Sequence, residues 1–137
     1  MAITHTFPWS TPTPRASGIA AAAVAAGGGV VTGDAINAGG DTHADITLTY
    51  GYAVAPTAGS SIAVRIMESD GTNYDSLTGR FVNQVPAVAD TTARYRTWTG
   101  VPLGPNLFKV QVSNGDPARE LTATVTVRTY RQAVESV

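Results

Sequence analysis

The sequence has no cysteine among its 137 residues. A disulfide framework, a thiolate nucleophile and a cysteine-ligated metal are therefore excluded, and the fold must be held by its core and its contacts. Histidine is scarce as well, since only His5 and His43 are present. No stretch approaches the roughly 20 strongly apolar residues that a membrane-spanning helix needs, so we expect no membrane partner.

Charge is also sparse. Charged residues make up 14% of the chain, against about 25% in ordinary soluble domains. The net charge is −1, which lacks the clustered cations of a nucleic-acid-binding surface. Lys109 is the one lysine, and the other basic residues are arginines, which are enriched at protein interfaces. A polar surface with so little charge favours contacts with neighbouring protein subunits.

What the sequence does contain is alternation of apolar and polar residues, most clearly from Asp45 to Asp75. Five apolar or aromatic residues share one face of the first segment: Ile46, Leu48, Tyr50, Tyr52 and Val54. Residues 56–60 then have turn chemistry, with Pro56 and Gly59. Ile62, Val64 and Ile66 share a face of the second segment. The pattern predicts two strands joined as a hairpin, each with one buried face.

Further strands are predicted at 30–36 with a break near Gly33, around Phe81, and at 91–101, 107–113 and 121–129. Strands at such spacing with turn signals between them, and with no convincing long helix, predict an all-β fold. We expect an antiparallel β-sandwich or jelly roll formed by residues 30–137.

The predicted strand at 91–101 carries an unusual face. Arg94, Arg96 and Trp98 share one side of it, and Tyr95, Thr97, Thr99 and Val101 share the other. Because Arg and Trp dominate binding energy at protein interfaces, we expect Arg94, Arg96 and Trp98 to form an interface on the body of the protein. A ligand platform is the alternative.

Residues 1–29 are predicted to form an extended N-terminal arm and an Ala/Gly-rich linker. The prolines of the arm disfavour helix, and Phe7 and Trp9 are costly to leave in water. We therefore expect Phe7, Trp9 and Ile19 to contact a neighbouring subunit. A disordered terminus is the alternative for 1–15, and a short helix for 20–29. The apolar run at 18–26 follows prolines rather than a basic segment, so we expect no signal peptide.

Catalytic motifs are missing from the sequence. Asp41, His43 and Asp45 alternate on one side of an extended segment, which is the one arrangement that a metal could use; a solvated strand start is the expected structure. Residues 70–75 lack the glycine and glutamate of an EF-hand, so we expect a turn capped by Asp and Asn side chains. No nucleophile elbow or phosphate loop is present. We expect no enzyme activity, no cofactor and no metal.

Three stretches resemble small β-sandwich virion structural proteins of tailed bacteriophages: ITLTYGYAVAPTAGSSIAVRIMESDGTNYD, VPLGPNLFKVQVSNG and LTATVTVRTY. The resemblance covers about residues 44–131. It implies a virion component, in particular a capsid decoration (cement) protein. Such a protein would bind the major capsid protein and copies of itself, as a dimer or trimer. It would lie on the capsid surface after synthesis in the cytoplasm of the bacterial host.

An alternative function is a carbohydrate- or receptor-binding sandwich of a tail fibre or another tail component. That function needs exposed aromatic rings flanked by polar side chains. Trp98, Tyr74 and Tyr130 are the candidates for these rings.

Overall fold

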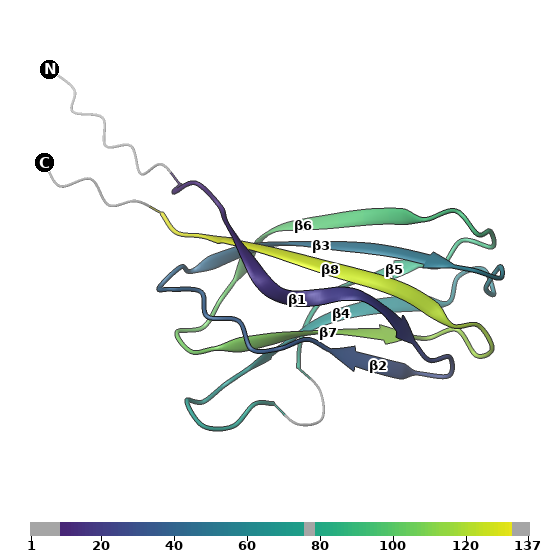
Figure 1. The fold of residues 1–137 in the computed structure, drawn as a ribbon, viewed down its shortest axis with the longest axis horizontal. Coiled ribbons are helices and arrows are strands. Elements are labelled where there is room, and N and C mark those ends of the chain that lie inside the picture. The colour runs from purple at the N-terminus through teal and green to yellow at the C-terminus, as the bar shows by residue number, and fades with distance from the viewer. Residues whose placement is uncertain (1–8, 76–78, 133–137) are drawn as a thin grey trace, which may run out of the picture.

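The computed structural model describes residues 9–75 and 79–132, except for the side chain of Ser17. Within these residues the chain forms eight β-strands in two four-stranded antiparallel sheets (Figure 1). The strands are β1 (Thr13–Val24), β2 (Gly29–Thr32), β3 (His43–Tyr52), β4 (Ser61–Glu68), β5 (Arg80–Pro86), β6 (Arg94–Pro102), β7 (Phe108–Asn114) and β8 (Leu121–Tyr130).

The strand order is β1-β8-β3-β6 in one sheet and β2-β7-β4-β5 in the other. Eight antiparallel strands in this order form a jelly roll, so the predicted fold class is confirmed. The predicted hairpin is wrong, however, because β3 and β4 lie in different sheets. The turn at 56–60 carries the chain across the core, and alternation along a strand does not identify the strand that pairs with it.

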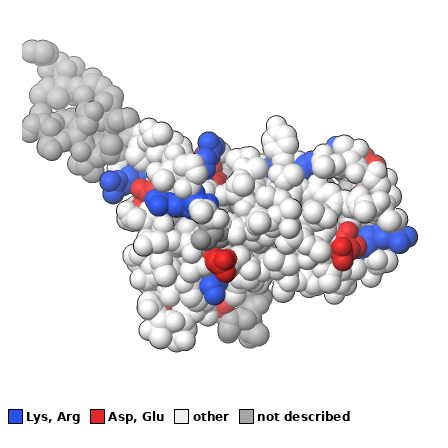
Figure 2. Space-filling view, in the orientation of Figure 1, with Lys and Arg blue, Asp and Glu red and all other residues white. Residues whose placement is uncertain are grey.

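The core lies between the two sheets and is made by the residues that alternate inward. Leu121, Val125 and Val127 of β8 are almost fully buried, as are Val110 and Val112 of β7. The largest fully buried side chains are those of Phe108, Ile36, Ile46, Leu48, Ile62, Ile66 and Leu121. The outward residues of β8 are mostly threonines. Figure 2 shows that charged side chains are few and scattered on the face in view.

The N-terminal segment departs from the prediction. Strand β1 pairs with β8 along its length, so the sandwich begins at Thr13, and the expected boundary between residues 29 and 30 is wrong. Ile19 is 4% exposed within this chain's own core, which corrects its expected place in a contact with another subunit. Two register shifts in β1, on either side of Ile19, hide the alternation in the sequence.

One buried side chain ties four parts of the fold together. Asn114, at the end of β7, is fully buried. Its amide oxygen accepts hydrogen bonds from the Tyr52 hydroxyl (2.8 Å) and the Asp116 N–H (3.1 Å). Its amide nitrogen donates to the carbonyls of Val24 (3.1 Å) and Arg119 (2.8 Å). All the hydrogen-bonding capacity of the side chain is therefore used, and β1, β3, β7 and the β7–β8 connection meet at this residue.

The same end holds a buried carboxylate. Asp116 accepts hydrogen bonds from the N–H groups of Thr57 (2.7 Å), Ala118 (3.1 Å) and Arg119 (2.7 Å), and from the Ser60 hydroxyl (3.1 Å). Burial opposes ionisation, but these donors outweigh it and lower the pKa of Asp116. Burial, with the nearby Asp116 charge, raises the pKa of Tyr52 to about 12. The β3–β4 and β7–β8 connections are thus held to each other.

Among the described residues, no helix has the length and hydropathy needed to cross a bilayer.

Candidate functional site

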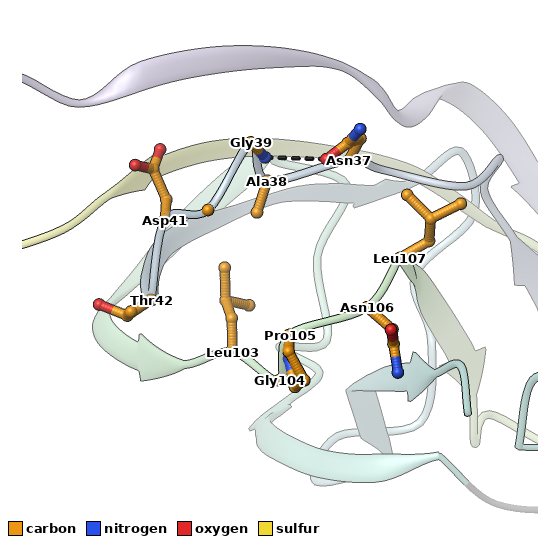
Figure 3. Close-up of a pocket in the computed structure, with 11 residues that line it drawn as sticks. Asn37, Ala38, Gly39, Asp41, Thr42, Leu103, Gly104, Pro105, Asn106 and Leu107 are labelled. Atoms are coloured by element: carbon orange, nitrogen blue, oxygen red, sulfur yellow. Dashed lines mark hydrogen bonds between the residues drawn. The ribbon is translucent and has the colours of Figure 1, made fainter. Parts of the chain in front are cut away.

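A pocket lies at the end of the sandwich where β3 begins (Figure 3). It has a volume of about 560 Å³ and lies between residues 37–42 and residues 103–107. Leu103 and Leu107 supply apolar surface, and Asn37 and Asn106 supply amides. No aromatic ring of the described residues lines it, so the pocket lacks the stacking surface on which a sugar would lie.

The titratable side chain that lines this pocket already has partners. Asp41 accepts hydrogen bonds from Arg15 (3.1 Å) and from the Thr129 hydroxyl (2.7 Å). The His43 ring nitrogen Nδ1 lies 2.9 Å from the Thr42 hydroxyl. Asp45 accepts a hydrogen bond from the Tyr130 hydroxyl at 2.9 Å. No group of three metal-binding side chains gathers in the part of the chain that the structure describes, so the alternating Asp-His-Asp pattern does not form a metal cluster there.

Asp70 caps the turn at 70–75, which confirms the Asp part of the predicted cap. Asp70 Oδ1 accepts hydrogen bonds from the N–H groups of Thr72 (2.9 Å) and Asn73 (2.8 Å). The bonds from Asn73 and Thr72 lower the pKa of Asp70. The carboxylate therefore has a structural task in this turn, as predicted.

The two long sides of the sandwich differ. On one side β1 packs against β2 and β7. On the other side lie β5 and β6, the edge strands of the two sheets, with a recess of about 310 Å³ between them. Arg80 of β5 bounds one end of this recess, because it donates to Glu68 (2.9 Å) and to the carbonyl of Pro102 in β6. We call this region, made by β5, β6 and their connection, the open side.

The predicted interface residues Arg94, Arg96 and Trp98 all lie on the open side. Their register pairs them with Tyr50, Leu48 and Ile46 of β3, so the three residues do share a face. That face points towards the other sheet. Trp98 packs against the core. Arg94 and Arg96 are exposed, because they lie near the start of β6, which is an edge strand.

These three side chains differ in their partners. Arg94 donates to Asp90 at 2.7 Å, and this hydrogen bond is the main cause of the lowered pKa of Asp90. Arg96 has no ion pair within the described residues. Trp98 Nε1 is buried and has no hydrogen-bond acceptor among them, which is rare for a buried donor.

Strand β6 contains a bulge that the sequence did not predict. Trp98 pairs with Ile46, but Val101 pairs with Ala44, so β6 has one extra residue. Gly100 takes a φ of 68° there, and its N–H donates to the Tyr130 hydroxyl at 2.8 Å. The bulge turns Val101 into the core, which corrects its predicted place beside Tyr95.

Exposed apolar residues flank the open side and were not predicted as part of a site. Phe81 of β5 is 50% exposed, Tyr95 of β6 is 76% exposed and Val88 of the connection is 44% exposed. Phe81 contacts Arg65, whose guanidinium lies 5.7 Å from the ring centroid. Nothing in the sequence pattern brings β5 beside β6, because the two strands belong to different sheets and alternation within one strand does not identify the strand that lies across from it.

Trp9 contacts its own chain. Its ring lies edge-to-face with His43 (4.9 Å between centroids) and Tyr130 (5.2 Å), and it remains 53% exposed. Ser10 N–H donates to the Arg131 carbonyl at 2.7 Å, which fixes this segment beside the end of β8. Phe7, which was predicted to contact a neighbouring subunit together with Trp9, lies outside the described residues.

Trp9 borders a second small recess. This recess has a volume of about 230 Å³ and is lined by Trp9, Ser10, Pro12, Asp45, Thr99 and Tyr130. Burial, followed by the hydrogen bond to Asp45, raises the pKa of Tyr130. We call this small recess the Trp9 recess.

The three predicted sugar-stacking rings do not form one platform. Trp98 packs on the core, and Tyr130 is 8% exposed. Tyr74 lies under the Lys109 ammonium, which is 4.3 Å from its centroid. Of the three, only Tyr130 borders the Trp9 recess.

No protein-family model matches the sequence, and no curated protein matches it. Among solved structures, one described as "CBM4 structure and function" is similar, with a TM-score of 0.41 and 15% sequence identity. The match covers 91% of this chain and 94% of that chain. This similarity concerns the β-sandwich fold alone.

Proposed function

We propose that this chain is a structural protein of a tailed-phage particle, specifically a capsid decoration protein that binds neighbouring subunits through its open side. The observation that carries the proposal is the composition of that side. Phe81 of β5 and Tyr95 of β6 are exposed on the two edge strands that bound it, and Arg96 of β6 has no ion pair within the described residues. Exposed aromatics and arginine without opposing acidic clusters are the residues that supply binding energy at protein interfaces.

The remaining surface is consistent with this role. The outward face of β8, β3 and β6 is built largely of threonines, and Thr47 and Thr97 bond to each other across it at 2.8 Å. Such a face offers hydroxyl groups in fixed positions and little net charge. Many copies held by modest contacts of this kind reinforce one another on a repeating shell, because each contact raises the effective concentration for the next. The resemblance to phage virion proteins supports the same role.

The experiment measures occupancy of the full-length protein on purified capsids of the phage that encodes it. Tyr95→Ser should lower the affinity for capsids about 30-fold, since an interface aromatic contributes about 2 kcal/mol. Thr122→Ser, an exposed change on β8 of the same sheet, is the matched control and should bind like the wild type. Capsids that bind no wild-type protein, or that bind Tyr95→Ser equally well, would contradict the proposal.

A second candidate function is carbohydrate or receptor binding at the Trp9 recess, as in a tail component. The observation that favours it is the pairing of a half-exposed indole with the Asp45 carboxylate and the Thr99 hydroxyl around one recess. An aromatic ring beside polar groups is the usual arrangement for binding a sugar ring. The recess is small, so it would hold about one sugar unit.

A glycan array with the full chain tests this second function. Trp9→Ala should lower the affinity for the bound glycan at least about tenfold, because one aromatic contact is worth about 1.5 kcal/mol. Tyr95→Ser lies outside the recess and should bind normally. Absence of saturable binding, or equal binding by Trp9→Ala, would eliminate the Trp9 recess as a sugar site.

A further inference from the structure

The four edge strands of the jelly roll are not equally free to accept another strand. β2 has only four residues, and β1 contains Pro14 and two register shifts. β5 ends in Pro86 and has a register shift, and its Asn83 side chain accepts a hydrogen bond from the Gln84 N–H at 2.8 Å. Prolines, bulges and short length protect a sheet edge from pairing.

β6 lacks these protections over residues 94–98. It contains no proline there and pairs with β3 in regular register from Arg94 to Trp98. No side chain of the described residues bonds to the backbone of this stretch. An edge strand leaves the N–H and C=O groups of alternate residues without a ladder partner. Of the four edge strands in the described residues, β6 is therefore the one most open to strand addition.

We propose that two copies of the chain pair through β6, antiparallel, about a two-fold axis at Thr97. The occupant of the β6 edge is thus a second copy of the same strand, and the two sheets join into one across the axis. This inference rests on the proposed function and names a second copy of the chain as one of the neighbouring subunits. In this register Arg96 of each copy lies opposite Trp98 of the other.

The side chains favour this register over the one centred on Arg96. Pairing centred on Arg96 would place the two arginines opposite each other, and like charges in that position are destabilising. Centred on Thr97, each guanidinium meets an indole, which is a favourable cation–π pair. Arg96 has no competing ion pair within the described residues, and the 310 Å³ recess beside Trp98 leaves room for its head group.

The outer face of the sheet continues across the same axis. Thr126, Thr47 and Thr97 form a row across β8, β3 and β6, with Thr47 opposite each of the other two. Pairing about Thr97 places Thr97 opposite its own copy and extends the row into the second chain. Directly opposed threonines are a favourable cross-strand pair. Both faces of β6 are therefore self-complementary in one register.

The first test is sedimentation velocity of the full chain. The wild type should sediment as a dimer, at twice the 14.1 kDa of one chain. Thr97→Lys places two ammonium groups opposite each other at the axis and should weaken the dimer at least tenfold. Thr122→Lys adds the same charge to an exposed position on β8 and should leave the dimer intact.

The second test uses the absence of cysteine from the chain. Thr97→Cys introduces the one thiol at the axis. Opposed residues of antiparallel strands have Cα atoms about 4.5–5.5 Å apart, which suits a disulfide. Mild oxidation should convert this variant to a covalent dimer on a non-reducing gel, whereas Thr122→Cys should stay largely monomeric.

A wild-type chain that is monomeric and a Thr97→Cys variant that does not crosslink would overturn the inference. So would a dimer that Thr97→Lys leaves intact. The capsid assay is separate from both tests. A β6 dimer that ignores capsids would refute the proposed function alone, and a monomer that still decorates capsids would refute the self-pairing alone.

Discussion

Replacing Asn114 by Asp tests whether one buried amide holds one end of the jelly roll together. The substitution keeps the size and shape of the side chain. It replaces the amide nitrogen, which donates to the carbonyls of Val24 and Arg119, by an oxygen. At neutral pH both carbonyls would then face a buried negative charge instead of a donor.

The expected cost follows from these contacts. Each buried carbonyl that loses its donor costs about 1–3 kcal/mol, so two of them cost about 4 kcal/mol. Two-state domains have total stabilities of about 5–15 kcal/mol. The Asn114→Asp variant should still fold, with a melting temperature lower by about 15 °C.

The penalty should depend on pH. Burial raises the pKa of the new carboxyl above its unfolded value of about 3.9. Below the unfolded pKa the carboxyl is protonated in both the folded and the unfolded state, so the penalty is smallest there. As the pH rises from the unfolded pKa towards the folded pKa, the carboxyl ionises in the unfolded state alone, and the folded state loses stability. The difference in unfolding free energy between wild type and variant should therefore grow from about pH 4 upwards, by about 1.4 kcal/mol per pH unit, until it levels off.

Urea unfolding followed by tryptophan fluorescence, from pH 3 to pH 8, measures this difference. Asn83→Asp is the matched control, because Asn83 is exposed and uses its oxygen as an acceptor; it should change stability by less than about 0.5 kcal/mol. A penalty below about 1 kcal/mol in Asn114→Asp, or one that does not change with pH, would refute the role assigned to this amide.

Three further predictions concern other parts of the fold. Gly18→Ala would place a Cβ 2.1 Å from the Val125 carbonyl oxygen, so it should separate β1 from β8 and cost at least about 2 kcal/mol in urea unfolding; an equal cost for Gly104→Ala, whose Cβ would lie 3.4 Å from the flexible Glu68 side chain, would contradict this reasoning. Trp98→Phe removes a buried donor that has no acceptor among the described residues and keeps a ring, so we expect a change within about 1 kcal/mol by thermal melting; a loss as large as that of Trp98→Ala would show that the indole N–H is bonded. Because the pKa of Asp116 is lowered in the folded state, its stabilising effect is present above the unfolded pKa and is lost as the pH falls towards the folded pKa. Asp116→Asn should therefore be less stable than the wild type at neutral pH and should lose less stability than the wild type on acidification. Parallel pH profiles of the two unfolding free energies would contradict this.

Period-2 alternation predicted the strands and the fold class but not the pairing. The inward residues of β7 and β8 are those that the sequence places on one face. The error over the β3–β4 hairpin arises because a strand pattern records only which face is buried. In a jelly roll that face packs on the opposite sheet, so consecutive strands can meet across the core and share no hydrogen bonds.

The first strand was missed for a different reason. β1 is rich in alanine, which gives little contrast between faces, and its two register shifts break the period. Gly18 shows what the segment requires, since a side chain there would collide with the backbone of β8. Helix propensity favoured this stretch, but its pairing with β8 and the burial of Ile19 and Val24 override it.

The candidate interface was only half predictable. Alternation placed Arg94, Arg96 and Trp98 on one face, and the register with β3 confirms that. That the face points inward, over an open side, depends on the position of β6 at the edge of its sheet. The contribution of Phe81 depends on β5 lying across from it. Neither is a property of a local sequence pattern.

The bulge in β6 limits the kind of assembly that its free edge can form. Regular pairing stops at Trp98, because the extra residue at Thr99 and Gly100 turns the strand and Pro102 follows. A short free edge that is self-complementary about one axis forms a closed pair, whereas a long edge, or two free edges, would allow open-ended growth. Since β5 is protected, a β6 dimer leaves no further edge of this kind in the described residues. On the pairing that we propose, the same bulge therefore limits association through β6 to a closed dimer.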